Sequence, residues 1–453
     1  MKFRKFGKAL LMSAISAGAV LSVTSCVQSY SVGFLYVTGT TTAQTTGNGI
    51  ISGFKIDHNT GKLNAINGMP ISSGGANPVR AVLLSGARFL YVLNRGVDPS
   101  GGDCKSAATP CTGSNIVQFS VGGNGILTAQ ETFYTEGNNP FRIFADSSGS
   151  FLYVLDHDAP PDAGSTTSAA CMSQFGTPNC GDISAFKVDP ATGRLSHLLN
   201  AQVTSSSGQQ LAYFPVQANP IDVILASSEV LTLSGTPATG DTVFPYAFSQ
   251  GNGQLSISQN SLQALNINQA TAIQYGDGDV YILDNEPLTI ATGAPGTVFP
   301  AGTYPSQIIP YTVGAGGALQ AATGGPVPID VTETNPLFLL PESKGKWVYV
   351  AAEGNLAITP NALSGITGYV IDTSTHQLTP MSGSPFGTGA GPQCLVEDPS
   401  DQFLYTANFN DSTVTGRVID QNSGVLSHLP GTANKPYAVN GPATYCLVDG
   451  RTS

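Results

Sequence analysis

Two arginines, Arg80 and Arg142, occupy the same position in two consecutive repeats of the chain, and Asp222 occupies that position in the next repeat. A guanidinium group is a planar fork of hydrogen-bond donors that suits a carboxylate, a phosphate or a polarised carbonyl group. The three residues therefore predict a binding site for a small anionic or sugar-like ligand. The alternative that fits the same pattern is an Arg–Asp network that only stiffens the fold.

A histidine flanked by acids is a further candidate for the same chemistry. His157 lies between Asp156 and Asp158 in a long connection, and an imidazole exchanges a proton near neutral pH. The other histidines are expected in turns or on outer strands. His376 stands where Gly61 stands in the first repeat, so it is predicted to be a turn residue with positive φ, which His tolerates better than most residues.

These candidates are positioned by a segment that recurs seven times along the chain. Each copy is a short run of aromatic and β-branched residues that ends at a polar or Gly-containing stretch, which is typical of a β-strand. The copies begin at Phe34, Phe89, Phe151, Glu229, Asp279, Trp347 and Phe403. A third strand, a tight turn and a fourth strand follow each copy. The repeat predicts an all-β fold, a seven-bladed β-propeller of four-stranded antiparallel blades.

The two ends of the array indicate how the ring closes. The strand at Phe34 has no first strand before it, whereas residues 441–449 form a strand that is left over at the C-terminus. We expect this strand to pair with the N-terminal blade, because the pairing removes an open sheet edge. Residues 34–453 are therefore predicted to form one domain.

One face of the propeller is predicted to carry the site. The long loops at 94–113, 156–181, 284–305 and 351–364 all join second to third strands, so they lie at the same end as the starts of the inner strands. Loops held by a rigid scaffold are frequent binding sites, which favours the mouth of the central channel. The fourth residues of the inner strands, expected around this mouth, are Arg80, Arg142, Asp222, Ala272, Phe338, Cys394 and Cys446.

Residues 1–26 have the pattern of an export signal. Basic residues among the first five positions precede an apolar run that ends at Val23, and this run is too short for a membrane-spanning helix. The segment that ends at Cys26 resembles a bacterial lipobox. Cys26 is therefore expected to carry a lipid, with residues 27–33 as a short tether to an exported protein at the outer membrane or the periplasmic face. The alternative is a plain secretory signal with an incidental cysteine.

Six further cysteines form three pairs by position, Cys104 with Cys111, Cys171 with Cys180, and Cys394 with Cys446. We expect the first two pairs to be disulfides that close long loops in an oxidising compartment, because their spacing is not that of a zinc site. The third pair stands on neighbouring inner strands. Whether it is bonded depends on those strands approaching within the roughly 7 Å Cα separation that a disulfide needs.

Composition narrows the classes of partner. Charged residues are 10% of the chain and the net charge is -11, whereas binding to nucleic acid needs a basic surface. No serine-hydrolase, zinc or nucleotide-binding motif is present in the sequence, so neither a cofactor nor a metal is predicted. We expect a monomer whose partners are the membrane, through the lipid, and a small molecule or a protein at the loop-rich face.

Three features of the sequence resemble a known family. They are the Phe-Leu-Tyr-Val strands, hairpins such as residues 56–63, and the segment Gly389-Ala390-Gly391-Pro392. From Phe34 onward the chain resembles the lactonase-type seven-bladed propellers, which include bacterial 6-phosphogluconolactonases, and more broadly the YVTN-repeat propellers. The resemblance implies hydrolysis of a lactone by an Arg-His pair after this Gly-Pro, where the present chain has Gln393 and Cys394 instead.

Two functions follow from the sequence. The first is an envelope lipoprotein that binds a small anionic or sugar-like ligand, or a protein partner, at the channel mouth through Arg80, Arg142 and Asp222. The alternative is a divergent lactone or ester hydrolase. In that case the resemblance implies Glu353 as the counterpart of a family glutamate, and the tentative catalytic residues are Arg80, Arg142, Glu353 and His157.

Overall fold

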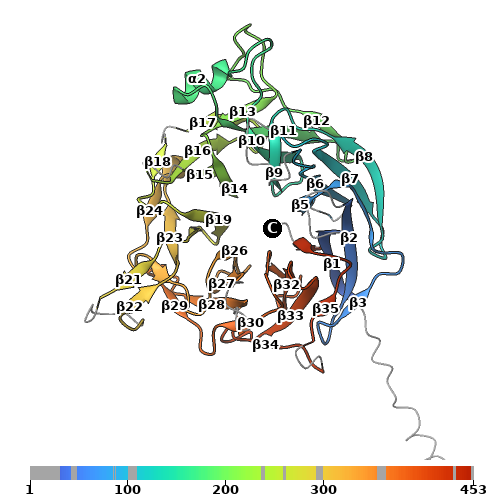
Figure 1. The fold of residues 1–453 in the computed structure, drawn as a ribbon, viewed down its shortest axis with the longest axis vertical. Coiled ribbons are helices and arrows are strands. Elements are labelled where there is room, and N and C mark those ends of the chain that lie inside the picture. Colours follow the sequence, from blue (N-terminus) through green and yellow to red (C-terminus); the bar gives the residue numbers. More distant parts are fainter. Residues whose placement is uncertain are drawn as a thin grey trace, which may run out of the picture.

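The computed structural model describes residues 31–41, 48–84, 86, 88–99, 110–235, 240–258, 262–291, 299–354, 364–431 and 435–449. Seven antiparallel sheets, the blades, are arranged as a ring around a common axis (Figure 1). The prediction of a seven-bladed β-propeller is therefore confirmed. The predicted signal segment with Cys26 and the first part of the predicted tether lie outside the described residues.

Each blade is built from an inner, a second, a third and an outer strand. The inner strands of blades 1 to 7 are β36 (Ala443–Val448), β5 (Pro78–Leu83), β9 (Asn138–Ala145), β14 (Pro220–Ala226), β19 (Ala270–Gly276), β26 (Pro336–Pro341) and β31 (Val396–Glu397). The second strands are β1 (Ser31–Thr40), β6 (Phe89–Asn94), β10 (Phe151–Asp158), β15 (Glu229–Ser234), β20 (Asp279–Asp284), β27 (Trp347–Ala352) and β32 (Phe403–Asn408). All seven recurring segments of the sequence are thus second strands.

The third and outer strands complete the blades. The third strands are β2 (Asn48–Asp57), β7 (Asn115–Val121), β11 (Gly181–Val188), β16 (Thr242–Phe248), β23 (Gln307–Val313), β28 (Gly365–Ile371) and β33 (Thr413–Ile419). The outer strands are β3 (Leu63–Ala65), β8 (Leu127–Phe133), β12 (Leu195–His197), β17 (Leu255–Ile257), β24 (Leu319–Ala321), β29 (Leu378–Pro380) and β34 (Leu426–His428).

Shorter elements decorate this frame. A short extra strand pairs with the third strand in every blade except blade 2. These strands are β4 (Ile71–Ala76), β13 (Tyr213–Val216), β18 (Gln263–Ala264), β25 (Val327–Pro328), β30 (Phe386–Gly387) and β35 (Tyr437–Ala438). The loops after the second strands contain the helix α2 (Ala169–Phe175) in blade 3 and the hairpin of β21 (Leu288–Ile290) and β22 (Gly302–Tyr304) in blade 5, and a single 3-10 turn, η1 (Ala315–Gly317), precedes β24. The sequence analysis predicted neither α2 nor this hairpin.

In five blades, the recurring Tyr of the second strand joins the blade to the next one. In blade 3, the buried Tyr153 hydroxyl donates a hydrogen bond to the carbonyl oxygen of Gly253, 2.8 Å away in the β16–β17 turn of blade 4. The ring of Phe151 packs against the same glycine so closely that a Cβ there would collide with it. Gly253 has a φ of +73°, so glycine serves both the turn and the close approach.

The same contact recurs around the ring. The tyrosine donates to the turn glycine of the following blade in the pairs Tyr36 and Gly125, Tyr91 and Gly193, Tyr349 and Gly424, and Tyr405 and Gly61. The last of these pairs joins blade 7 to blade 1. The repeated Phe and Tyr of the sequence are therefore contacts between blades as well as core residues of one blade.

Blade 5 uses a different contact at this place. Its second strand begins with Asp279 instead of Phe, and the turn that it faces in blade 6 carries His376 instead of Gly. The Nδ1 atom of His376 lies 2.7 Å from the Oδ2 atom of Asp279, and His376 has a φ of +59°. The prediction that His376 is a turn residue is confirmed, and the two exceptional residues meet as a pair.

The ring closes through the C-terminal strand, as predicted. β36 pairs antiparallel with β1, which places strands from both ends of the chain in blade 1. The register corrects one residue of the sequence alignment. Tyr445 faces Thr38, the fifth residue from Phe34, as Arg80 faces Leu93, the fifth residue from Phe89. Tyr445, and not Cys446, is therefore the counterpart of Arg80, because one unit of register turns a side chain to the other face of a strand.

Candidate functional site

The start of each inner strand is a backbone turn that fixes the residues around the channel mouth. Asn or Gly with positive φ precedes the inner-strand Pro in six blades, at Asn77, Asn139, Asn219, Asn335, Gly391 and Gly441. The carbonyl oxygens of several of these residues accept a hydrogen bond from the residue that follows the second strand, as from the amide of Arg95 to Asn77 at 2.9 Å. Side chains at the start of the inner strand and just after the second strand are thus held by a rigid backbone frame.

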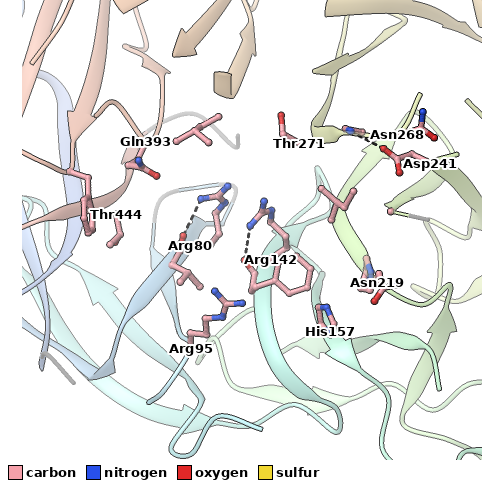
Figure 2. Close-up of a pocket in the computed structure, with 18 residues that line it drawn as sticks. Arg80, Arg95, Arg142, His157, Asn219, Asp241, Asn268, Thr271, Gln393 and Thr444 are labelled. Carbon is pink, nitrogen blue, oxygen red and sulfur yellow. Dashed lines mark hydrogen bonds between the residues drawn. The ribbon is translucent and has the colours of Figure 1, made fainter. Parts of the chain in front are cut away.

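These turns surround a cavity of about 790 Å³, which we call the mouth cavity (Figure 2). Every blade contributes to this lining the residue that stands just before the fourth position of its inner strand. These seven residues are Val79, Phe141, Ile221, Thr271, Leu337, Gln393 and Thr444. The volume lies in the range of small-molecule sites.

Four basic or imidazole side chains also line the mouth cavity. They are Arg80, Arg95, Arg142 and His157, all from blades 2 and 3. Asp241 is the one carboxylate among the described lining residues, and its Oδ2 atom accepts a hydrogen bond of 2.7 Å from the amide of Ala270. Cationic groups therefore gather on one side of the cavity, as the labels of Figure 2 show.

Arg142 is held by an acid from the next blade. Its Nε atom donates to the Oδ1 atom of Asp222 at 2.7 Å, and Nη1 donates to the carbonyl oxygen of Phe141 at 3.2 Å. Asp222 is buried, and its other oxygen accepts from the amide of Ile273 at 3.2 Å. The predicted Arg–Asp network exists, but Asp222 lies behind Arg142 and is not among the lining residues of the cavity.

The guanidinium group of Arg80 lies over aromatic rings. Its guanidinium carbon lies 4.7 Å from the ring centre of Tyr445 and 5.7 Å from that of Phe338, which stabilises a cation by cation–π attraction. Burial, and next the positive charge of Arg142, lower the pKa of Arg80 to about 10, so it stays charged at neutral pH. No ion pair to Arg80 is present within the described part of the chain.

His157 reaches the cavity, whereas the two aspartates beside it do not line it. The Nδ1 atom of His157 lies 3.2 Å from an oxygen of Asp158. Asp156 is fully buried in blade 3, where Thr135 and Ser184 donate hydrogen bonds to it. Burial raises the pKa of Asp156 well above its ordinary value.

Glu353 is not brought to the arginines. It follows β27 and is half-buried, and the Nδ2 atom of Asn335 donates to its Oε2 atom at 2.7 Å. A second amide, from Asn410, lies 3.4 Å from Oε1. Glu353 is absent from the described lining of the mouth cavity. It holds two turns of the mouth face together.

Arg95 is a lining arginine that the sequence analysis missed. It follows β6 as His157 follows Asp156 in β10, because Asn94 and Asp156 are the sixth residues counted from Phe89 and Phe151. An alignment of the residues that follow the second-strand cores, alongside that of the inner strands, was the signal that could have found it.

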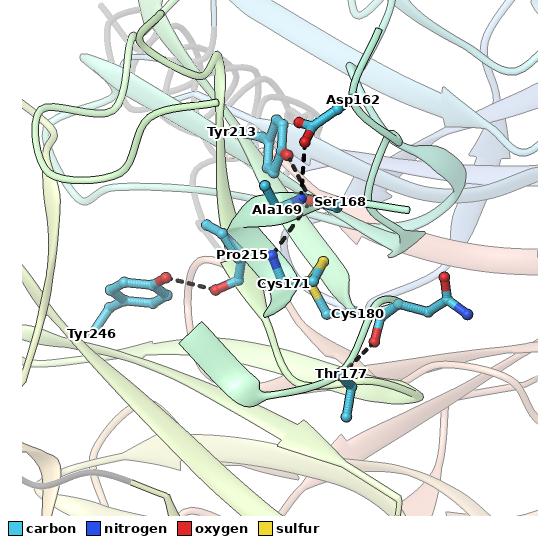
Figure 3. Close-up of a disulfide and its surroundings, with 10 residues drawn as sticks. Asp162, Ser168, Ala169, Cys171, Thr177, Cys180, Tyr213, Pro215 and Tyr246 are labelled. Atoms are coloured by element: carbon cyan, nitrogen blue, oxygen red, sulfur yellow. Dashed lines mark hydrogen bonds between the residues drawn. A yellow bond between two sulfur atoms is a disulfide. The ribbon is translucent and has the colours of Figure 1, made fainter. Parts of the chain in front are cut away.

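Two of the predicted disulfides are present. Cys171 and Cys180 are bonded with a Cα separation of 5.5 Å, and the bridge closes the loop that carries α2 (Figure 3). The Oγ atom of Ser168 caps this helix by accepting from the amide of Cys171 at 3.3 Å. The loop that leaves His157 is therefore fastened at its far end.

The third pair of cysteines stands close enough to form a disulfide. Cys394 and Cys446 are bonded, and their Cα atoms are 5.9 Å apart, within the limit for a disulfide. The bond links the inner strands of blades 7 and 1. Cys104 lies outside the described residues, so the bridge predicted for it stays a prediction.

The described residues contain neither a cluster of metal-binding side chains nor a membrane-spanning helix. Within them, no group of three or more His, Cys, Asp or Glu residues could hold a metal ion. Among the same residues, no helix has the length and apolar character needed to cross a bilayer. The two disulfides indicate an oxidising compartment.

The fold places the protein among the seven-bladed β-propellers, with a cavity at the mouth of the central channel. The family model of "Lactonase, 7-bladed beta-propeller" matches residues 48–160. The resemblance to this family that the sequence suggested is therefore confirmed. A comparison with curated proteins finds no match.

Solved structures share the fold over nearly the whole chain. A putative 6-phosphogluconolactonase from Bacteroides uniformis has a TM-score of 0.61 and 11% identity, and the match covers 92% of this chain and 99% of that one. A second from Bacteroides fragilis has a TM-score of 0.61 and 14% identity, over 94% and 99% of the chains. The periplasmic gluconolactonase of Pseudomonas aeruginosa has a TM-score of 0.58 and 14% identity, over 92% and 98%. At these identities the likeness describes the fold alone.

Proposed function

We propose that this protein is an exported, lipid-anchored propeller that binds a small carboxylate-bearing, sugar-like ligand in the mouth cavity. The observation that carries the proposal is Arg80, a charged side chain that faces a cavity of about 790 Å³ without an ion pair among the described residues. The anchor is an expectation from Cys26, and the disulfides support export.

The character of the cavity supports this class of ligand. Arg80, Arg95 and Arg142 supply donors for a carboxylate on one side, and a guanidinium group binds that shape with two parallel hydrogen bonds. Thr271 and Gln393 line other parts of the mouth cavity, away from Arg95 and His157, and offer polar groups that can bind the hydroxyl groups of a sugar. Because the protein carries a net charge of -11, a local cluster of cations is the feature that selects an anion.

The test is a titration of the purified protein with D-gluconate and D-glucuronate by calorimetry. Arg80→Met and Arg95→Met should each weaken binding by at least about tenfold, the effect of losing a charge-assisted hydrogen bond. Arg88→Met is the matched control, because Arg88 is exposed and stacks on Phe89 away from the mouth cavity. Equal affinities in all three variants, or no binding of either sugar acid, would refute the proposal.

Hydrolysis of a lactone is the second candidate, and His157 is the observation that favours it. His157 lines the same cavity as the arginines, and one of the similar structures bears the name gluconolactonase. In this reaction His157 takes a proton from a water that attacks the carbonyl carbon. Arg80 stabilises the negative oxygen, and the ring C–O bond breaks when the proton passes to the leaving oxygen.

The two candidates are separated by one variant. His157→Gln should abolish turnover of δ-gluconolactone. The affinity for gluconate should stay within about threefold of that of the unmodified protein, because the arginines bind the carboxylate group. A protein that binds gluconate but does not accelerate lactone hydrolysis is a binding protein. If turnover occurs and His157→Gln retains all of it, the assigned role of His157 is wrong.

A further inference from the structure

A second cavity lies at the outer rim of the propeller, where blades 6 and 7 meet. It is lined by third, outer and extra strands and not by the inner strands that surround the channel mouth. We call this cavity of about 610 Å³ the rim cavity. Its walls come from β30 of blade 6 and from β33, β34 and β35 of blade 7, which lie next to one another in Figure 1. The side chains that matter for its chemistry are Arg417, His428, Lys435 and Thr415.

Arg417 is a buried cation in this wall. It stands in the middle of β33 and is 8% exposed, and its Nη2 atom donates to the carbonyl oxygen of Gly387 across the joint between the blades. Its Nε atom is buried and has no hydrogen-bond partner. Within the described part of the chain, no acid forms an ion pair with it. A buried charge without a counter-charge is costly.

The neighbours of Arg417 in this wall bring no negative charge. Its Nη1 atom contacts both ring nitrogens of His428, at 3.2 Å for Nε2. Burial, and next the charge of Arg417, lower the pKa of His428, so the imidazole is neutral and accepts from the guanidinium. Lys435 is exposed at the edge of the cavity. Among the described lining residues none is acidic.

Thr415 supplies a further group on the same wall. It lies two residues before Arg417 in β33, so both side chains point to one face of the strand. Its Oγ1 atom accepts hydrogen bonds from the amide of Gly389 and from Asn408, each at 3.0 Å. The hydroxyl proton is therefore directed to another acceptor.

We propose that the rim cavity is a second binding site, which takes a small organic molecule through its carboxylate or phosphate group. The oxyanion would accept from the guanidinium group of Arg417 and from Lys435 and would neutralise the buried charge. The volume exceeds what a single inorganic anion fills, since it lies in the range of drug-sized ligands. The site uses none of the residues of the mouth cavity, so it stands independently of the proposed function.

The first experiment locates the anion. Crystals of the protein are soaked with tungstate, an electron-dense tetrahedral oxyanion, and its anomalous signal is mapped. A peak within hydrogen-bond distance of Arg417 and near Lys435 is expected. A map with peaks at other places and none in the rim cavity would overturn the proposal.

The second experiment measures affinity with inorganic phosphate and with citrate, which represent the two chemistries. Lys435→Gln should weaken the binding of whichever anion the cavity takes by about threefold, as expected for a solvent-exposed charge, and Arg417→Met should weaken it by at least about tenfold. Lys187→Gln is the control, because Lys187 is exposed on blade 3 and lines neither of these cavities.

The outcomes of the second experiment are distinct. If Arg417→Met fails to fold, Lys435→Gln still decides, because its side chain is exposed and supports no packing. Tighter binding of phosphate than of citrate identifies a phosphate ester as the ligand class, and the reverse order identifies a carboxylate. Unchanged affinity in Lys435→Gln and Arg417→Met together, or no binding of either anion by the unmodified protein, contradicts the proposal.

Discussion

Replacement of Tyr153 by Phe isolates the contact that joins one blade to the next. The change removes the hydroxyl that donates to Gly253 at 2.8 Å and keeps the ring. The ring stacks on Phe144 with a centroid distance of 5.1 Å and meets Phe248 edge-on at 6.1 Å, and Phe preserves both contacts. Any decrease in the free energy of unfolding therefore reports the loss of the hydrogen bond alone.

The expected loss follows from burial. Tyr153 is fully buried, so the carbonyl oxygen of Gly253 loses a partner that water replaces poorly. Removal of one partner of a buried hydrogen bond costs about 1–3 kcal/mol. We expect urea unfolding, followed by circular dichroism, to show a free energy of unfolding lower by this amount.

The chain offers a matched control in the same repeat. Tyr281 has the same place in blade 5, but its hydroxyl lies 3.4 Å from Asp279 of its own strand and, among the described residues, bonds to no other blade. Tyr281→Phe should cost less than about 1 kcal/mol, since long hydrogen bonds contribute little. The reasoning fails if Tyr281→Phe destabilises as much as Tyr153→Phe, or if Tyr153→Phe leaves the unfolding midpoint unchanged.

Four further predictions concern ring closure, the seam, a buried acid and the mouth cavity. A chain that ends at residue 440 lacks β36 and should not fold, and a cooperative thermal transition of that fragment would contradict the composite blade. Replacement of Cys394 by Ser should lower the free energy of unfolding by about 4 kcal/mol, which chain-entropy theory gives for a separation of 52 residues, and a reducing agent should have the same effect on the unmodified protein. Burial raises the pKa of Glu333 from 4.5 to about 8, so between these values the folded state holds a proton that the unfolded state releases. The contribution of this group to stability should therefore be complete below pH 4.5 and be lost between 4.5 and about 8, and pH-dependent unfolding should show that Glu333→Gln removes this part of the slope. Asp222→Asn removes the charge that competes for Arg142, so calorimetry should find gluconate bound about threefold more tightly, and weaker binding would mean that Asp222 itself serves the ligand.

The fold was predictable because its information is repeated. A strand pattern that recurs seven times specifies the blades, the turns and the ring, and the leftover C-terminal strand specifies the closure. The register of β36 was harder, because the run of four apolar residues from Tyr445 to Val448 does not distinguish two alignments one residue apart. Backbone pairing with Thr38 selects Tyr445.

The candidate site was predictable only in part. Arg80 and Arg142 were found because they break a repeated position, and His157 because it stands between acids. The direction of Glu353 depends on the hydrogen bond from Asn335, which connects two loops of one blade, and no pattern in the sequence reveals it. The rim cavity depends on the side-by-side packing of blades 6 and 7, which a linear repeat does not describe.

The bond between Cys394 and Cys446 has a consequence for how molecules meet one another. A propeller closed by a terminal strand can exchange that strand, because β36 of one copy fits blade 1 of another as well as its own, and such exchange links copies into dimers or open chains. The disulfide ties β36 to blade 7 of the same copy. An oxidised molecule therefore keeps its own strand, and domain swapping is confined to molecules that have been reduced or have not yet formed the bond.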